Sequence, residues 1–176
     1  MIFSADKKIY IRRALFAALI ILTAAFQNTE GIIPSFSDVR PMLLIPLCVC
    51  IAMHERSMGG LAFGVLCGVL WDASGVRGDG FFSVCLACAG FFSGVLITYF
   101  MRNNIFAALI ISGASCVTVN VIYWMVFILF KGYEGAAGLL FSFYLPCAFY
   151  SFLFTFLYYC LVRLIVEATP VGKKRT

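Results

Sequence analysis

The sequence predicts an all-α protein that forms a polytopic transmembrane helical bundle. The first observation is composition: of 176 residues, 63% are hydrophobic and 12% are charged, whereas a soluble domain is about 45–50% apolar and about 25% charged. The second is that the apolar residues fall in long runs with short polar connections, as membrane crossings of roughly 20 apolar residues require. Six such spans would use most of the chain, so we expect residues 1–176 to form a single membrane domain without an extramembrane catalytic unit.

The first three spans lie in the first half of the chain. The first is expected at about residues 10–27, after a basic segment. A basic segment before an apolar run also describes a signal peptide, but we favour a retained span because the rest of the chain is polytopic. The second and third spans are expected at about residues 36–53 and 59–72, on either side of a polar segment at residues 54–57. Both are short, and we interpret them as a helical hairpin with a solvated turn.

The remaining three spans fill the second half of the chain. The fourth and fifth are expected at about residues 80–101 and 105–130. The last apolar stretch, residues 136–166, would be roughly 46 Å long as one helix, whereas the hydrocarbon core is about 30 Å thick. Because proline interrupts a helix interior, we divide this stretch at Pro146, with an interfacial or bent segment at residues 136–145 and the sixth span at about residues 146–166. A single kinked helix is the alternative.

Six spans place both termini on one side of the membrane, and the basic residues indicate which side. Ten of the 13 lysines and arginines lie at the termini or in the connections of that side, whereas Arg40, Arg77 and Lys131 lie on the other. The positive-inside rule therefore predicts that both termini are cytoplasmic. A basic rim beside anionic lipid headgroups also accounts for the net charge of +5, so we expect no nucleic-acid partner.

The residue types predict no reaction. All eight cysteines lie in apolar runs, where cysteine packs as a small apolar residue. Cys85 and Cys88 have metal-ligand spacing, but a zinc site needs four ligands, and the single histidine, His54, lies in another segment. We interpret His54 and Glu55 as solvated turn residues, and the span interiors carry no charge that would mark an ion pathway. We therefore expect no catalytic residue, no metal and no cofactor.

The strongest local pattern is a run of small residues at four-residue spacing, which falls on one face of a helix. Its members are Gly60, Gly64, Gly68 and Asp72. Gly90 and Gly94 repeat the spacing in the next span. Small residues so spaced let helices approach closely in lipid, so we expect the third and fourth spans to pack on each other or on a partner's helix. Asp72 would hold the outer loop, anchor a partner, or be a solvated residue at the helix end.

A wider arrangement surrounds this run. Arg40 and Pro41 precede an apolar run and a polar turn, the glycine run ending in Asp72 follows, and after a short loop Gly80 opens a span that contains Gly90. In order and spacing this resembles the MreD family, the small polytopic rod-shape-determining membrane proteins of bacteria. The match covers about a third of the chain, and the remainder is similar in length and hydropathy.

The resemblance implies a non-enzymatic role in cell elongation at the bacterial cytoplasmic membrane. The implied partners are the bitopic protein MreC, the actin-like MreB, and the RodA glycosyltransferase with its class B penicillin-binding protein. The family would hold these proteins in one complex for peptidoglycan synthesis, with the glycine face and Asp72 as candidate contacts. The implied fold is like that of the substrate-binding subunits of energy-coupling-factor vitamin transporters, and the alternative is that the chain is itself such a subunit. Homodimerisation stays open.

Overall fold

The computed structural model describes residues 2–29, 41–74, 80–101, 103–129, 138 and 143–169. These residues form helices and short turns with no strand among them, so the predicted all-α class is confirmed. The elements in chain order are α1 (Ile2–Asn28), α2 (Leu44–Ser74), α3 (Phe81–Tyr99), α4 (Ile105–Trp124), the π-helical η1 (Met125–Leu129), α6 (Leu145–Leu153) and α7 (Thr155–Ala168).

Within the described residues, five helical segments are long and apolar enough to cross a membrane. They are Lys7–Asn28, Leu44–Ser74, Phe81–Tyr99, Ile105–Ile128 and Leu145–Ala168. The chain is therefore a multi-pass membrane protein. The count differs from the six predicted spans because the predicted third span and the described part of the predicted second span both fall within one element, α2.

Helix α2 is sharply bent at Arg56, whose backbone is not helical (φ 65°, ψ −179°). A Cβ added at Gly60 would lie 2.8 Å from the Cβ of Ala52, and one added at Gly90 would lie within 3.2 Å of both the Gly60 carbonyl oxygen and Cys48 Sγ. In a straight helix, residues 48 and 60 would be about 18 Å apart. The two halves of α2, residues 44–55 and 57–74, therefore fold back against each other as a hairpin.

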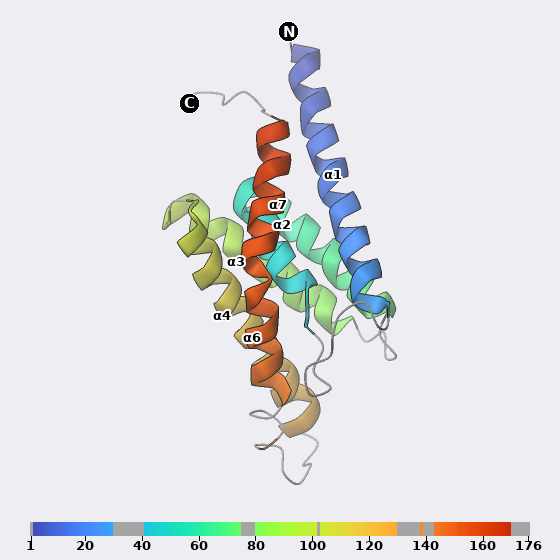
Figure 1. The fold of residues 1–176 in the computed structure, drawn as a ribbon, viewed down its shortest axis with the longest axis vertical. Coiled ribbons are helices and arrows are strands. Elements are labelled where there is room, and N and C mark those ends of the chain that lie inside the picture. The colour runs from blue at the N-terminus through green and yellow to red at the C-terminus, as the bar shows by residue number, and fades with distance from the viewer. Residues whose placement is uncertain are drawn as a thin grey trace.

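The first half of α2 is the centre of the core. Every residue from Leu44 to Met53 is buried, and Figure 1 shows this cyan segment in the middle of the bundle. Its sequence is apolar on all faces, which is typical of a helix that protein surrounds completely. Phe16 and Ile20 of α1 and Val162 of α7 are also fully buried and belong to the same cluster.

Polar contacts fix the two ends of the bundle. The beginning of α1 and the end of α7 lie on the same side (Figure 1), and there the Asn103 side chain donates a hydrogen bond to the Met53 carbonyl (3.3 Å). At the other end, Gln27 Oε1 accepts from the backbone N–H of Leu43 (2.8 Å). Asn28 Nδ2 donates to Ser74 Oγ there (2.6 Å). These contacts fix the positions of the two ends of the α2 hairpin along the bundle axis.

The described part of the last apolar stretch, residues 143–166, contains one break. Pro146 occupies the first turn of α6, where proline is tolerated, so this helix begins beside the predicted start at residue 146. The break separates α6 from α7 at Phe154, and the hydropathy pattern did not predict it. Most of the predicted bent segment 136–145, the start of the predicted second span, the loop 75–79 and Arg40 lie outside the described residues.

Candidate functional site

The glycine face of α2 packs directly on α3. A Cβ added at Gly64 would lie 2.9 Å from the Cα of Ala87 and closer still to the Leu86 carbonyl oxygen. One added at Gly68 would lie 2.7 Å from the backbone nitrogen of Ser83. Real carbon contacts are about 3.5–4.0 Å, so these positions hold the two helices at backbone contact and have no room for any side chain.

The glycines of α3 face the same interface from the other side. Gly60 and Gly90 oppose each other, and a Cβ added at either would clash with the other's carbonyl oxygen. A Cβ added at Gly94 would lie 2.7 Å from the Cα of Ser57, beside the bend of α2. The sequence left open whether this face meets the chain's own helix or a partner's. The structure places all five glycines against the chain's own backbone.

Asp72 caps α3 from the preceding helix. Its carboxylate accepts hydrogen bonds from the Phe82 N–H (3.3 Å), the Ser83 N–H (2.9 Å) and the Ser83 hydroxyl (2.6 Å). The first N–H groups of a helix lack helical partners, and negative charge there is favourable. Gly80, which precedes α3 with a φ of 70°, supplies no side-chain cap. Asp72 is therefore half-buried and hydrogen-bonded, and the reading of it as a solvated turn residue is wrong.

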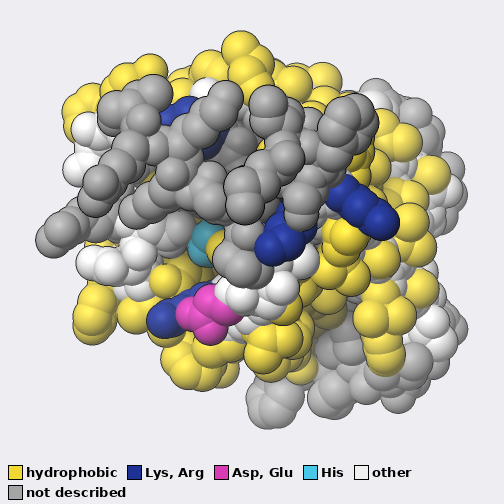
Figure 2. Space-filling view, turned by 90° about the horizontal axis from the view of Figure 1, so that it is seen from above, with side chains coloured by type: hydrophobic (Ala, Val, Ile, Leu, Met, Phe, Trp, Pro, Cys, Tyr) yellow, Lys and Arg dark blue, Asp and Glu magenta, His cyan; other side chains and the backbone are white. Residues whose placement is uncertain are grey.

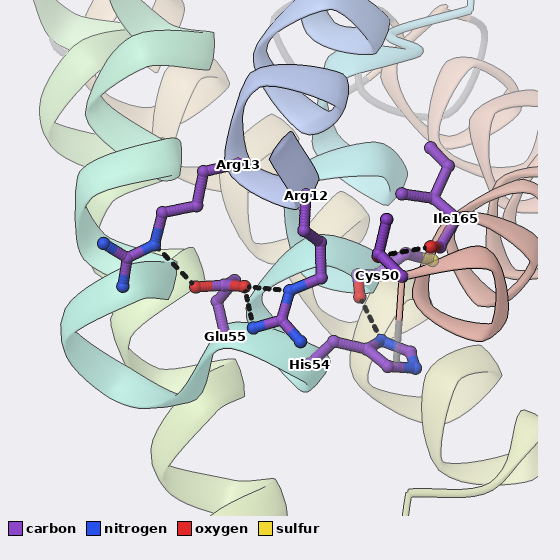
Figure 3. A network of polar contacts seen from close by, with 7 residues as sticks. Arg12, Arg13, Cys50, His54, Glu55 and Ile165 are labelled. Atoms are coloured by element: carbon purple, nitrogen blue, oxygen red, sulfur yellow. Dashed lines mark hydrogen bonds and ion pairs between the residues drawn. The ribbon is translucent and has the colours of Figure 1, made fainter. Parts of the chain in front are cut away.

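A buried carboxylate links the bend of α2 to α1. Figure 3 shows Glu55 between two arginines: Arg12 Nη2 lies 2.5 Å from Oε1, and Arg13 Nε lies 3.2 Å from Oε2. The Glu55 side chain is 2% exposed, so its interpretation as a solvated turn residue is wrong. No local pattern around Glu55 indicates this contact, because the arginines are more than 40 positions away. His54 beside it is half-buried, with Nδ1 3.1 Å from the Cys50 carbonyl oxygen.

Polar side chains inside the apolar runs also tie helices together, and the sequence analysis missed them. The Ser112 and Thr155 hydroxyls are 2.8 Å apart between α4 and α7. Ser151 Oγ accepts from the Met42 N–H (2.7 Å), directly after the buried Pro41. Asn120, by contrast, donates to the Cys116 carbonyl within its own helix α4 (2.8 Å), and its buried Oδ1 has no hydrogen-bond partner among the described residues. Such residues in membrane helices are a recognisable signal for interhelical contacts.

The cysteines are distributed along several helices. Cys48, Cys50, Cys67, Cys116 and Cys147 are buried, whereas Cys88 and Cys160 are exposed on the helix surface. Across residues 2–29, 41–74, 80–101, 103–129 and 143–169, no three histidine, cysteine or acidic side chains are grouped to hold a metal ion.

Scans against models of protein families, curated proteins and solved structures return no match to this chain. We therefore infer function from the sequence pattern and from the contacts described above.

Proposed function

We propose that this protein is a non-enzymatic membrane component of the bacterial cell-elongation machinery, similar to MreD. It would hold an MreC-like bitopic protein, an MreB-like filament, and RodA with a class B penicillin-binding protein in one complex. It would lie in the cytoplasmic membrane, cross it six times and keep both termini in the cytoplasm.

The observation that carries the proposal is that the described residues of the resemblance pack together in one unit. Pro41 precedes the central helix, the glycines join the α2 hairpin to α3, and Asp72 caps α3. Gly80 takes the left-handed conformation that opens α3, which glycine adopts at least cost. The order and spacing that resemble the family thus correspond to one structural feature, a helical hairpin that packs at backbone contact on the next helix.

The α2 hairpin supports six crossings. Its first half, residues 44–55, is only about 18 Å long, which is short for a hydrocarbon core of about 30 Å. This half is buried in protein, however, and non-helical backbone at membrane depth is tolerated where protein surrounds it. Gln27 satisfies the N–H groups of Leu43 and Leu44 at its start. The positive-inside rule then favours cytoplasmic termini.

The glycine face cannot also be the partner contact, because α3 already occupies it. We therefore place the bitopic partner's helix on a groove of about 460 Å³ between α3 and α4. Small side chains at helical spacing line it: Cys85, Ala89 and Ser93 on α3, and Ala114 and Thr118 on α4. Small residues of this kind, with hydroxyl groups among them, are the usual contact surface between helices in lipid.

Depletion of the protein in its host tests the proposed function. Loss of rod shape is expected; unchanged shape with loss of vitamin uptake would instead support the transporter-subunit alternative.

Co-purification of a single-span partner with wild type and with Ala114→Leu tests the groove. Ala114 is exposed, so the variant should keep its melting temperature but lose the partner. Val117→Leu, also exposed on α4 but outside the groove, is the matched control and should keep it.

A further inference from the structure

A second cavity, of about 700 Å³, lies among the bend of α2, the start of α4 and the second half of α7. Its size falls in the range of small-molecule sites, about 300–1,000 Å³. Its polar lining is His54, Asn103, Asn104, Tyr159, Arg163 and Glu167. Figure 2 views the molecule from this end, where basic, acidic and histidine side chains gather in the middle of a largely hydrophobic surface.

The charged wall of this cavity carries both signs. Arg163 Nε and Glu167 Oε1 are 2.7 Å apart, and the two side chains are 62% and 64% exposed. An exposed pair one turn apart on a helix contributes little and reorganises readily. Among the described residues, Glu167 is the hydrogen-bond partner of the Arg163 guanidinium, which has five N–H donors. Within the described part of the chain, the other guanidinium N–H groups and Glu167 Oε2 therefore remain available to a ligand.

Apolar side chains also line the cavity. Phe106 of α4 and Phe156 of α7 line the cavity and are exposed. Both lie in segments long and apolar enough to cross the membrane. Arg163 lies five residues before the end of α7, about 7.5 Å along the helix axis, where a long basic side chain reaches the headgroup layer.

We propose that this cavity binds the headgroup of a zwitterionic phospholipid, in which a phosphate stands next to an ammonium group. The phosphate would accept hydrogen bonds from Arg163, and the ammonium would donate to Glu167. The acyl chains would lie along Phe106 and Phe156. Because the cation and the anion of this wall lie side by side, the Glu167 carboxylate would repel a headgroup that is purely anionic. The phenylalanines favour a lipid over a water-soluble phosphate. This proposal does not depend on the role in cell elongation.

Native mass spectrometry of the purified full chain, titrated separately with phosphatidylethanolamine, phosphatidylglycerol and soluble glycerophosphoethanolamine, tests the proposal. Wild type should bind one phosphatidylethanolamine more tightly than either of the others. Arg163→Gln should weaken that binding about tenfold, as loss of one charge-assisted hydrogen bond implies, and Arg163→Lys should keep most of it. Glu167→Gln should shift the preference towards phosphatidylglycerol.

The matched control is Lys8→Gln, which removes an exposed positive charge from α1 outside the cavity. It should bind like wild type. Equal binding by Arg163→Gln and Lys8→Gln would overturn the site. Equal binding of phosphatidylglycerol by wild type would overturn the zwitterionic preference, and equal binding of glycerophosphoethanolamine would overturn the lipid assignment. A melting curve for each variant separates loss of the site from loss of the fold.

Discussion

Gly64→Ala tests whether the α2–α3 interface needs backbone contact. The added Cβ would lie 2.9 Å from the Cα of Ala87 and nearer to the Leu86 carbonyl oxygen. Both are main-chain atoms of a helix, so neither can rotate away, and the helices must separate by roughly 1 Å to restore normal contact. Overpacking of this kind costs about 1–3 kcal/mol. Replacing glycine by alanine inside a helix returns up to about 1 kcal/mol. The contacts are with main-chain atoms, so the cost should exceed this gain, and a net loss of up to about 2 kcal/mol is expected. Gly64→Leu should lose more.

Gly113→Ala is the matched control. Gly113 also lies inside a helix, but its added Cβ would meet only the ring of Phe152, at 3.3 Å. That side chain can adjust by a few tenths of an ångström, so the gain in helix propensity should prevail and stability should stay equal or rise. Thermal unfolding of the detergent-solubilised protein distinguishes the two variants, since 1 kcal/mol corresponds to about 2–4 °C in a chain of this size. Equal melting temperatures for Gly64→Ala and Gly113→Ala would refute the reasoning.

Three further predictions concern the polar contacts and the bend. Asp72→Ala removes the cap on α3 and should destabilise the protein by about 1–2 kcal/mol. Ser83→Ala loses only one of the three hydrogen bonds and should destabilise it less. Equal losses of stability in chemical denaturation would contradict the capping role. Arg12→Gln should lower the stability more than Arg13→Gln. The Arg12 and Arg13 side chains are 16% and 55% exposed, and exposed ion pairs are worth only about 0–1 kcal/mol. The reverse order of melting temperatures would show that burial does not set the strength of these pairs. Arg56→Gly should raise stability by about 1 kcal/mol. The reason is that the backbone of Arg56 (φ 65°, ψ −179°) lies in a region that only glycine occupies without strain. A lower melting temperature would mean that the Arg56 side chain makes a contact that outweighs this strain.

The sequence predicted the helices well because hydropathy and helix breakers act locally. The short apolar runs around residues 54–57 indicated a hairpin, and the structure bends at Arg56. The four-residue glycine spacing indicated close approach, but spacing on one helix cannot identify the second helix. That required the contacts of Gly64 with Leu86 and Ala87.

Glu55 marks the limit of local reasoning. In the sequence it stands among polar neighbours, which made it look solvated. Its environment is set by Arg12 and Arg13, which reach it only because α1 lies beside the bend of α2. Likewise, the position of Asp72 at a helix end was predictable, whereas its acceptor role towards Ser83 depends on how the start of α3 packs against the end of α2.

Because α3 occupies the glycine face, packing within the protein and contact with a partner can be assigned to different surfaces, which the glycine spacing alone does not allow. If Gly60, Gly64 and Gly68 touched a partner, a substitution there would weaken assembly and leave the isolated protein stable. Since they touch α3 instead, the same substitution should destabilise the isolated protein first, and any loss of assembly would be a consequence. The converse holds for Ala114, which is exposed in the groove between α3 and α4. Variants that lower stability should therefore map to the α2–α3 interface, whereas variants that remove a partner without lowering stability should map to the groove between α3 and α4. This separation of two surfaces is the physical content of the proposal that the protein acts by holding other helices.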